Sequence, residues 1–148
     1  MKNEFEFKNQ LDDIITAWPQ DQSELRKAFI SLAAEIEMKP GTTMDLVSRP
    51  EISHSIRAKA SHARVGRERP LYTMLDVITP RMGPWMLSLC FYEDEITDVQ
   101  EYGQAVPQGL YGETGYCFDL DVFDQKPVDY LKERIAEAYR AATAASTV

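Results

Sequence analysis

The sequence predicts an α+β domain, and two observations on its hydrophobic pattern support this class. Near both ends of the chain, apolar residues recur every three to four positions, which is the spacing of amphipathic helices. Between these segments the spacing changes to every second residue, as in strands with one buried face. We therefore expect an N-terminal helical hairpin, a mostly antiparallel four-stranded sheet and a C-terminal helix packed on one sheet face.

The first helix is predicted from about Glu4 to Ala17, with one apolar stripe formed by Phe7, Leu11, Ile14, Ile15 and Trp18. Pro19 ends it, because proline cannot donate a backbone hydrogen bond. The second helix is predicted from about Gln22 to Met38, with Asp21 as N-cap and Glu24 completing a capping box. Its stripe consists of Leu25, Phe29, Leu32 and Ile36. We expect the two helices to pack as an antiparallel pair.

Four segments then alternate between apolar and polar residues, at 42–48, 52–60, 71–79 and 85–92. A further short strand or turn is expected over Tyr116–Val122. The last helix is predicted to begin near Pro127, since proline is tolerated in the first turn. The predicted core contains Phe29, Leu32, Leu87, Leu89, Phe91, Leu131 and Ile135.

Length and composition indicate one domain, residues 1–148, with a flexible C-terminal tail at about 143–148. Apolar residues make up 44% of the chain and charged residues 27%, which is ordinary for a folded domain. The first ten residues are charged throughout, and no run approaches the roughly 18 apolar residues of a membrane span. We therefore expect a soluble, cytoplasmic protein without a membrane partner.

The charge is unevenly distributed along the chain. The formal net charge is -8, which makes nucleic acid an unlikely partner because phosphates are repelled. Residues 49–81, however, contain seven Lys and Arg but only three Asp and Glu, so the formal net charge of this segment is +4. The remainder holds nine basic and twenty-one acidic residues, giving -12. The middle of the sequence is a basic segment in an acidic protein.

This basic segment supplies the candidate ligand-binding residues Arg57, Lys59, Arg64, Arg67 and Arg69. Arg57 and Lys59 share one face of a predicted strand, and the three remaining arginines follow in a polar loop. Guanidinium groups bind carboxylates and phosphates in a bidentate manner. The pattern thus predicts a site for an anionic small molecule or an acidic protein partner. The alternative is that these arginines pair with the protein's own carboxylates.

Residues with catalytic or metal-binding potential form no complete set, so we expect no metal and no cofactor. Cys90 and Cys117 lack a Cys-x-x-Cys spacing and are expected to be reduced thiols. His54 and His62 have no metal-ligand spacing, and His54 is expected to be a hydrogen-bonded core or half-buried residue. The glycines of segment 109–115 do not follow a phosphate-loop pattern.

The long segment 94–117 has no clear periodicity, and two interpretations of it stay open. It could be a plain surface loop, or a lid over a cleft. The aromatic residues within and beside it either line such a cleft or attach the loop to the domain; they are Tyr102, Tyr111, Tyr116 and Phe118.

The preferred functional hypothesis is a non-catalytic binding module that uses the basic strand and loop. One alternative is a small enzyme that holds an anionic substrate beneath the glycine-rich loop. Another is a structural homodimer in which a second copy covers Met74, Ile78 and Met86. The sequence leaves open whether any catalysis occurs.

Overall fold

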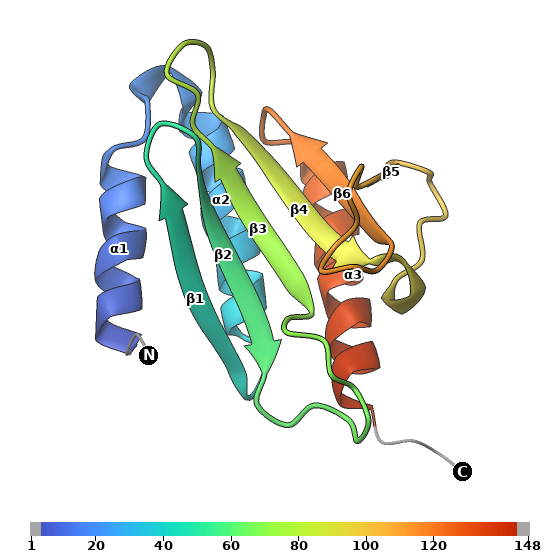
Figure 1. Cartoon of the computed structure of the whole chain (residues 1–148). Coiled ribbons are helices and arrows are strands. Elements are labelled where there is room, and N and C mark those ends of the chain that lie inside the picture. The colour runs from blue at the N-terminus through green and yellow to red at the C-terminus, as the bar shows by residue number, and fades with distance from the viewer. Residues whose placement is uncertain (1–3, 145–148) are drawn as a thin grey trace.

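A six-stranded antiparallel sheet organises the fold (Figure 1). The computed structural model describes residues 4–144. The strands lie side by side in the order β1-β2-β3-β4-β6-β5. They are β1 (Thr42–Arg49), β2 (Ser53–Ala60), β3 (Thr73–Ile78), β4 (Met86–Tyr92), β5 (Gln104–Ala105) and β6 (Gly115–Leu120). The first four strands are neighbours in sequence as well as in space, and each pairs antiparallel with the next. A short turn joins β1 to β2, whereas a longer loop, residues 61–72, joins β2 to β3.

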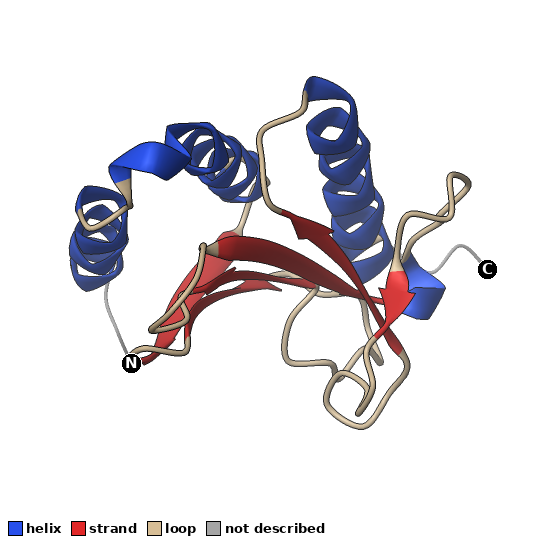
Figure 2. Ribbon diagram, turned by 90° about the horizontal axis from the view of Figure 1, so that it is seen from above, coloured by secondary structure: helices blue, strands red, loops and turns tan. Residues whose placement is uncertain are grey.

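The α-helices cover one face of this sheet, and the opposite face carries only loops (Figure 2). They are α1 (Glu4–Thr16), α2 (Ser23–Glu37) and α3 (Gln125–Thr143). Two short 3₁₀ turns, η1 (Gln20–Gln22) and η2 (Glu93–Glu95), connect elements. In the described chain, α2 packs against α3, while α1 lies mainly on β1.

The α+β class is confirmed, but the predicted four-stranded sheet is too small. The structure adds β5 and β6, both from the part of the chain without a sustained alternating pattern. β6 begins at Gly115, one residue before the predicted start at Tyr116. β5 is only two residues long, which is too short to show an alternation of apolar and polar residues. The helical hairpin also differs in detail, because α1 packs on the sheet edge more than on α2.

The first residues of α2 and α3 differ from those predicted. Asp21 lies within η1 and is not the N-cap; Gln22 holds that position and makes no side-chain cap bond. The predicted start of α3 is two residues late, because Asp124 is its N-cap and accepts a hydrogen bond from the Lys126 N–H at 3.3 Å. Most of the predicted flexible tail, from residue 145 on, lies outside the described residues.

The core lies between the sheet and its helices, as predicted. One row of directly opposed residues, Ile56, Leu75, Leu89 and Phe118, runs across β2, β3, β4 and β6. All seven residues predicted for the core are buried. The helix stripes and the alternate strand positions therefore meet on the same side of the sheet. None of the described helices combines the length and the apolar character needed to cross a membrane.

Replacing Phe91 with alanine tests this core. Phe91 is fully buried and its ring lies 5.8 Å from that of Phe118. We expect Phe91→Ala to lower the free energy of unfolding by about 3–5 kcal/mol, measured by urea denaturation. Phe5→Ala is the matched control, because Phe5 is 73% exposed, and it should change stability by less than about 0.5 kcal/mol. Equal effects of the two variants would contradict the core assignment.

Candidate binding site

The five candidate basic residues fall into two separate groups. Arg64, Arg67 and Arg69 lie in the connection between β2 and β3. Arg57 and Lys59 lie on β2, on the sheet face opposite the helices, because Ile56 and Ala58 point into the core. The structure therefore brings the cations near one end of the sheet, but the two groups have different surroundings.

Arg67 forms a buried bidentate ion pair with Glu95 of η2. Its Nε and one terminal nitrogen donate to the two carboxylate oxygens at 2.8 and 2.7 Å. The side chains are only 4% and 3% exposed. Arg67 also donates to the Leu71 carbonyl oxygen at 2.9 Å. A buried charge is stable only with such complete pairing, so this guanidinium is committed to the fold.

Arg69 is held in the same way by carboxylates from the long loop. It donates to both oxygens of Asp94, at 2.7 and 3.0 Å, and to both oxygens of Glu113, at 2.9 and 2.7 Å. Hydrogen bonds from Arg69 lower the pKa of the Asp94 and Glu113 carboxyl groups below their usual range. Its guanidinium carbon also lies 4.3 Å from the centroid of the Tyr92 ring.

Arg64 of the β2–β3 connection links this network to the end of the C-terminal helix α3. Its Nε donates to the Ala141 carbonyl oxygen at 2.8 Å, and a terminal nitrogen lies 3.9 Å from Glu95. Together the three loop arginines face three carboxylates, Asp94, Glu95 and Glu113. The three loop arginines therefore pair with the protein's own carboxylates, which was the alternative prediction. These ion pairs attach segment 94–113 to the β2–β3 connection.

Arg57 and Lys59 have more open surroundings. The guanidinium carbon of Arg57 lies 5.9 Å from the centroid of the Tyr111 ring, and its Nε is buried without a hydrogen-bond partner among the described residues. Nearby on β3, burial raises the pKa of Asp76, an effect that Ser55 and Arg57 partly offset. Lys59 is exposed on the same face. Arg57 and Lys59 therefore differ from the three loop arginines, which are paired with carboxylates.

The glycine-rich loop contacts the rest of the domain through Leu110 and Glu113. Leu110 is buried and packs with Leu71 and Tyr92. Glu113 is bound to Arg69 as described, and the Leu110 N–H donates to the Glu113 carbonyl oxygen at 2.7 Å. Gly109 at this turn has φ +75°, and a Cβ there would lie 2.7 Å from that carbonyl oxygen, so only glycine fits.

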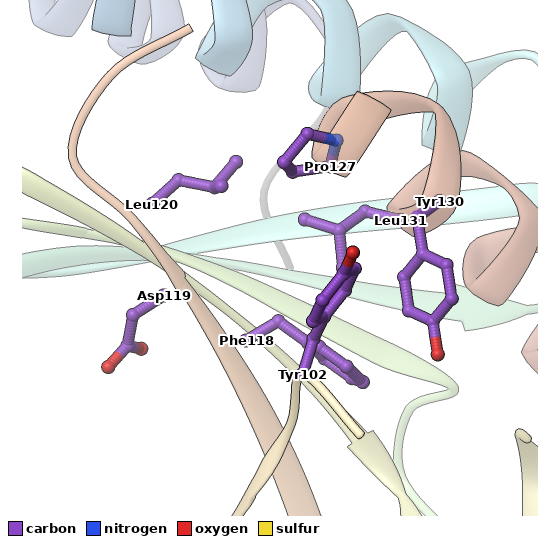
Figure 3. A pocket seen from close by; sticks show the side chains of 7 residues that line it. All are labelled: Tyr102, Phe118, Asp119, Leu120, Pro127, Tyr130 and Leu131. Atoms are coloured by element: carbon purple, nitrogen blue, oxygen red, sulfur yellow. The ribbon is translucent and has the colours of Figure 1, made fainter. Parts of the chain in front are cut away.

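The largely apolar cleft of the described chain lies elsewhere, between β6 and the first turns of α3 (Figure 3). Its volume is about 240 Å³. The lining residues come from β6, from α3 and from the loop before β5; they are Tyr102, Phe118, Asp119, Leu120, Pro127, Tyr130 and Leu131. Tyr102 forms an exposed wall, while Phe118 and Leu131 are buried and form the floor.

Asp98 holds the aromatic wall of this cleft in place. Its carboxylate accepts hydrogen bonds from the Tyr130 hydroxyl, from the Tyr102 N–H at 3.1 Å and from the Gly103 N–H at 2.8 Å. Burial alone would raise the pKa of Asp98, but these hydrogen bonds and the charge of Arg134 bring it below the usual value. The Tyr102 and Tyr130 rings then meet edge to face, with centroids 5.0 Å apart.

Among the described residues, the histidines and cysteines singled out in the sequence lie apart from one another across the sheet, except for the Cys90–Cys117 pair. His54 lies on the helix-covered side of the sheet and is paired with Ser48, with 2.8 Å between Nδ1 and Oγ. Cys90 lies on the opposite side, in the row with Arg57 and Met74, so His54 cannot serve it as a base. Burial raises the pKa of Cys90 to about 12. Within residues 4–144, no group of three or more potential metal ligands exists.

The surface considered for a homodimer is partly covered by the chain itself. Met74 packs against the cluster of Leu71, Tyr92 and Leu110. Ile78 and Met86 are half-buried and lie directly opposite each other on β3 and β4.

Comparison with known proteins adds no functional information. The chain matches no protein-family model, no curated protein and no solved structure. The site must therefore be interpreted from its own geometry.

Sequence reasoning found only part of the cleft. Tyr102 and Phe118 were expected either to line a cleft or to attach the loop, and they line one. Tyr111 instead lies over Arg57. Pro127, Tyr130 and Leu131 fall within the predicted last helix, and no sequence feature relates them to the long loop. No local pattern signals their contact, because it depends on where α3 docks.

The Arg67–Glu95 pair gives a stability prediction. Glu95→Gln leaves the Arg67 charge buried without its carboxylate, so we expect a loss of about 3–5 kcal/mol in the free energy of unfolding. Asp94→Asn is the control, because Asp94 is 69% exposed and its removal should cost at most about 1 kcal/mol. Denaturation curves of both variants measure the difference. A Glu95→Gln protein as stable as the wild type would contradict the structural role of the pair.

Proposed function

We propose that this protein is a non-catalytic binding module whose cleft between β6 and α3 receives an apolar side chain of a basic protein partner. The observation that carries the proposal is the cleft itself, which has mainly carbon lining and an exposed aromatic wall, Tyr102. Small-molecule pockets usually measure about 300–1,000 Å³. At about 240 Å³ this cleft is smaller, which favours a single side chain over a larger ligand.

The choice of a basic partner follows from the charges around the cleft. Residues 119–129 carry four aspartates, Asp119, Asp121, Asp124 and Asp129, and one lysine, Lys126. All four carboxylates are exposed. The sequence suggested an acidic partner, but the loop arginines that motivated this idea are paired internally. The charge left for a partner near the cleft is negative, and complementary charge favours association with Lys and Arg.

The absence of catalysis is part of this proposal and has its own support. In the described part of the chain, the cleft contains one carboxylate, Asp119, and no histidine, cysteine or serine. The Tyr130 hydroxyl donates a hydrogen bond to the Asp98 carboxylate, and burial raises the pKa of Tyr130. Such a cleft offers packing surface and edge charge, which suits recognition more than proton transfer or nucleophilic attack.

A short peptide tests the proposal. The probe is a pentapeptide with one central phenylalanine, glycine on both sides and a lysine at each end. Titrated into ¹⁵N-labelled protein, it should cause saturable shifts in the amide signals of residues 118–120 and 128–131 and of Tyr102. Replacing phenylalanine with serine in the peptide should abolish the shifts. Replacing both lysines with glutamate should weaken binding, because the cleft edge is acidic.

Two tyrosines offer a matched pair of variants for this titration. Tyr102→Ser removes the wall of the cleft, whereas Tyr111→Ser removes a ring of similar exposure (55% and 52%) further along the same segment. Aromatic anchors at interfaces contribute about 2 kcal/mol or more, so Tyr102→Ser should weaken peptide binding about tenfold or more. Tyr111→Ser should leave it unchanged. Shifts elsewhere, or equal loss in both variants, would count against the cleft.

A second candidate function is capture of an anion by Arg57 and Lys59 on the open sheet face. The observation that favours it is the buried Nε of Arg57, which has no hydrogen-bond partner among the described residues. A buried N–H donor without a partner is unusual in a folded protein. An anion bound there would satisfy it and would lie beside Lys59 and the exposed ring of Tyr111.

Calorimetric titration with inorganic pyrophosphate tests this second candidate. At low ionic strength we expect saturable binding that weakens as salt is added, since the contact is between charges. Arg57→Gln should abolish it. Arg26→Gln, which removes an exposed arginine of α2 and changes the net charge equally, should have no effect. Absence of saturable heat from the wild type would remove this candidate.

A further inference from the structure

Cys90 and Cys117 lie directly opposite each other on the neighbouring strands β4 and β6. Both are free thiols. They share the sheet face opposite the helices, because the adjacent pair, Leu89 and Phe118, points into the core. The two side chains therefore project from facing positions on the same side.

The hydrogen-bonding pattern brings these two residues especially close. The Glu93 N–H donates to the Thr114 carbonyl oxygen at 3.0 Å, just beyond the paired residues Tyr92 and Gly115. Tyr92–Gly115 is thus a non-hydrogen-bonded pair, and so is Cys90–Cys117, two residues further along both strands. Such pairs have Cα atoms about 4.5 Å apart. This lies within the range of about 4.4–6.8 Å that a disulfide spans.

Ser88 gives independent evidence that the sulfur atoms are neighbours. Its hydroxyl oxygen lies 3.9 Å from the Cys90 sulfur. The same hydroxyl interacts with the Cys117 thiol, where it partly offsets the effect of burial on the thiol pKa. One hydroxyl group thus lies near both thiols.

We propose that Cys90 and Cys117 form a redox modification site, at which hydrogen peroxide or an organic hydroperoxide converts the two thiols into a cross-strand disulfide. The half-buried Cys117 reacts first, because Cys90 is only 5% exposed. Its sulfur takes one oxygen atom and becomes a sulfenic acid, and the hydroperoxide is reduced to water or an alcohol. The Cys90 sulfur then attacks the Cys117 sulfur and forms the S–S bond. The hydroxyl group leaves with the Cys90 proton as water.

The surroundings of the pair set the rate of this reaction. Burial raises the pKa of the Cys90 thiol to about 12 and also raises the pKa of Cys117. The thiolate is the reactive form, so both residues stay reduced at neutral pH until peroxide accumulates. Oxidation should accelerate as the pH rises toward the thiol pKa values. The site thus responds to strong or sustained oxidation and not to brief exposure.

The crosslink would tie down the segment between the two cysteines. This segment carries Tyr102 of the cleft wall and the carboxylates Asp94, Glu95 and Glu113 that bind the loop arginines. A covalent bond between β4 and β6 restricts the unfolded chain and should raise the midpoint of thermal unfolding. The inference does not rest on the proposed peptide-binding function, since it concerns the opposite side of β6.

Intact mass spectrometry tests the proposal on the wild-type protein. After treatment with hydrogen peroxide, the chain is unfolded and exposed to iodoacetamide without reductant. We expect a product lighter by two hydrogen atoms that takes up no label, and full labelling of both cysteines after dithiothreitol. Peptide mapping should show one crosslink, between Cys90 and Cys117, and the oxidised protein should unfold at a higher temperature than the reduced one.

Single variants separate this pathway from other oxidation chemistry. Cys90→Ser leaves Cys117 without a partner, so its sulfenic acid should accumulate and react with dimedone. Cys117→Ser should keep Cys90 reduced, because Cys90 is buried. The proposal is overturned if both wild-type thiols still take up iodoacetamide after peroxide treatment. It is equally overturned if Cys117 proceeds to sulfinic acid without a crosslink, or if the disulfide joins two chains.

Discussion

The buried ion pair between Arg67 and Glu95 is the contact on which the arrangement of one whole end of the molecule depends. Arg67 belongs to the connection between β2 and β3, and Glu95 belongs to η2 directly after β4. Once these two charges are out of water, each requires the other. The pair therefore fixes the start of the long segment 93–114 against a loop nearly thirty residues earlier in the chain.

The neighbouring contacts extend this constraint. Arg69 joins Asp94 to Glu113, so it closes the long segment at both of its ends. Leu110 and Tyr92 pack together beneath these charges, with the Tyr92 ring against the Arg69 guanidinium. A loop that lacks its own secondary structure is thereby ordered by charge pairs around a small apolar cluster. These contacts hold both ends of the loop. In its middle, residues 98–103, the Asp98 carboxylate accepts hydrogen bonds from the backbone and so positions the cleft wall.

The same pairing decides which partner chemistry is reasonable. A protein with a basic segment and an acidic remainder would present one basic and one acidic surface if these charges did not pair with each other. Here the acidic loop and the basic loop neutralise each other within the fold. Exposed aspartates remain in segment 119–129, and one of them, Asp119, lines the apolar cleft. The electrostatic preference is therefore a property of the folded surface. The charge of the basic segment taken alone gives a different answer, because its loop arginines are paired within the fold.

The sequence by itself determined the three α-helices of the described chain, the first four strands and the core, since each depends on a local period of apolar residues. Trp85, Leu87, Leu89 and Phe91 alternate whatever their neighbours are, so their strand could be found without knowing its partners. Only the tertiary structure decided the pairing of β6 with β4, the carboxylates with which the loop arginines pair, and the position of the cleft. Arg69 meets Asp94 and Glu113 from positions 25 and 44 residues away. No local period encodes such distant contacts, because their energy comes from burial and charge pairing after the sheet has formed.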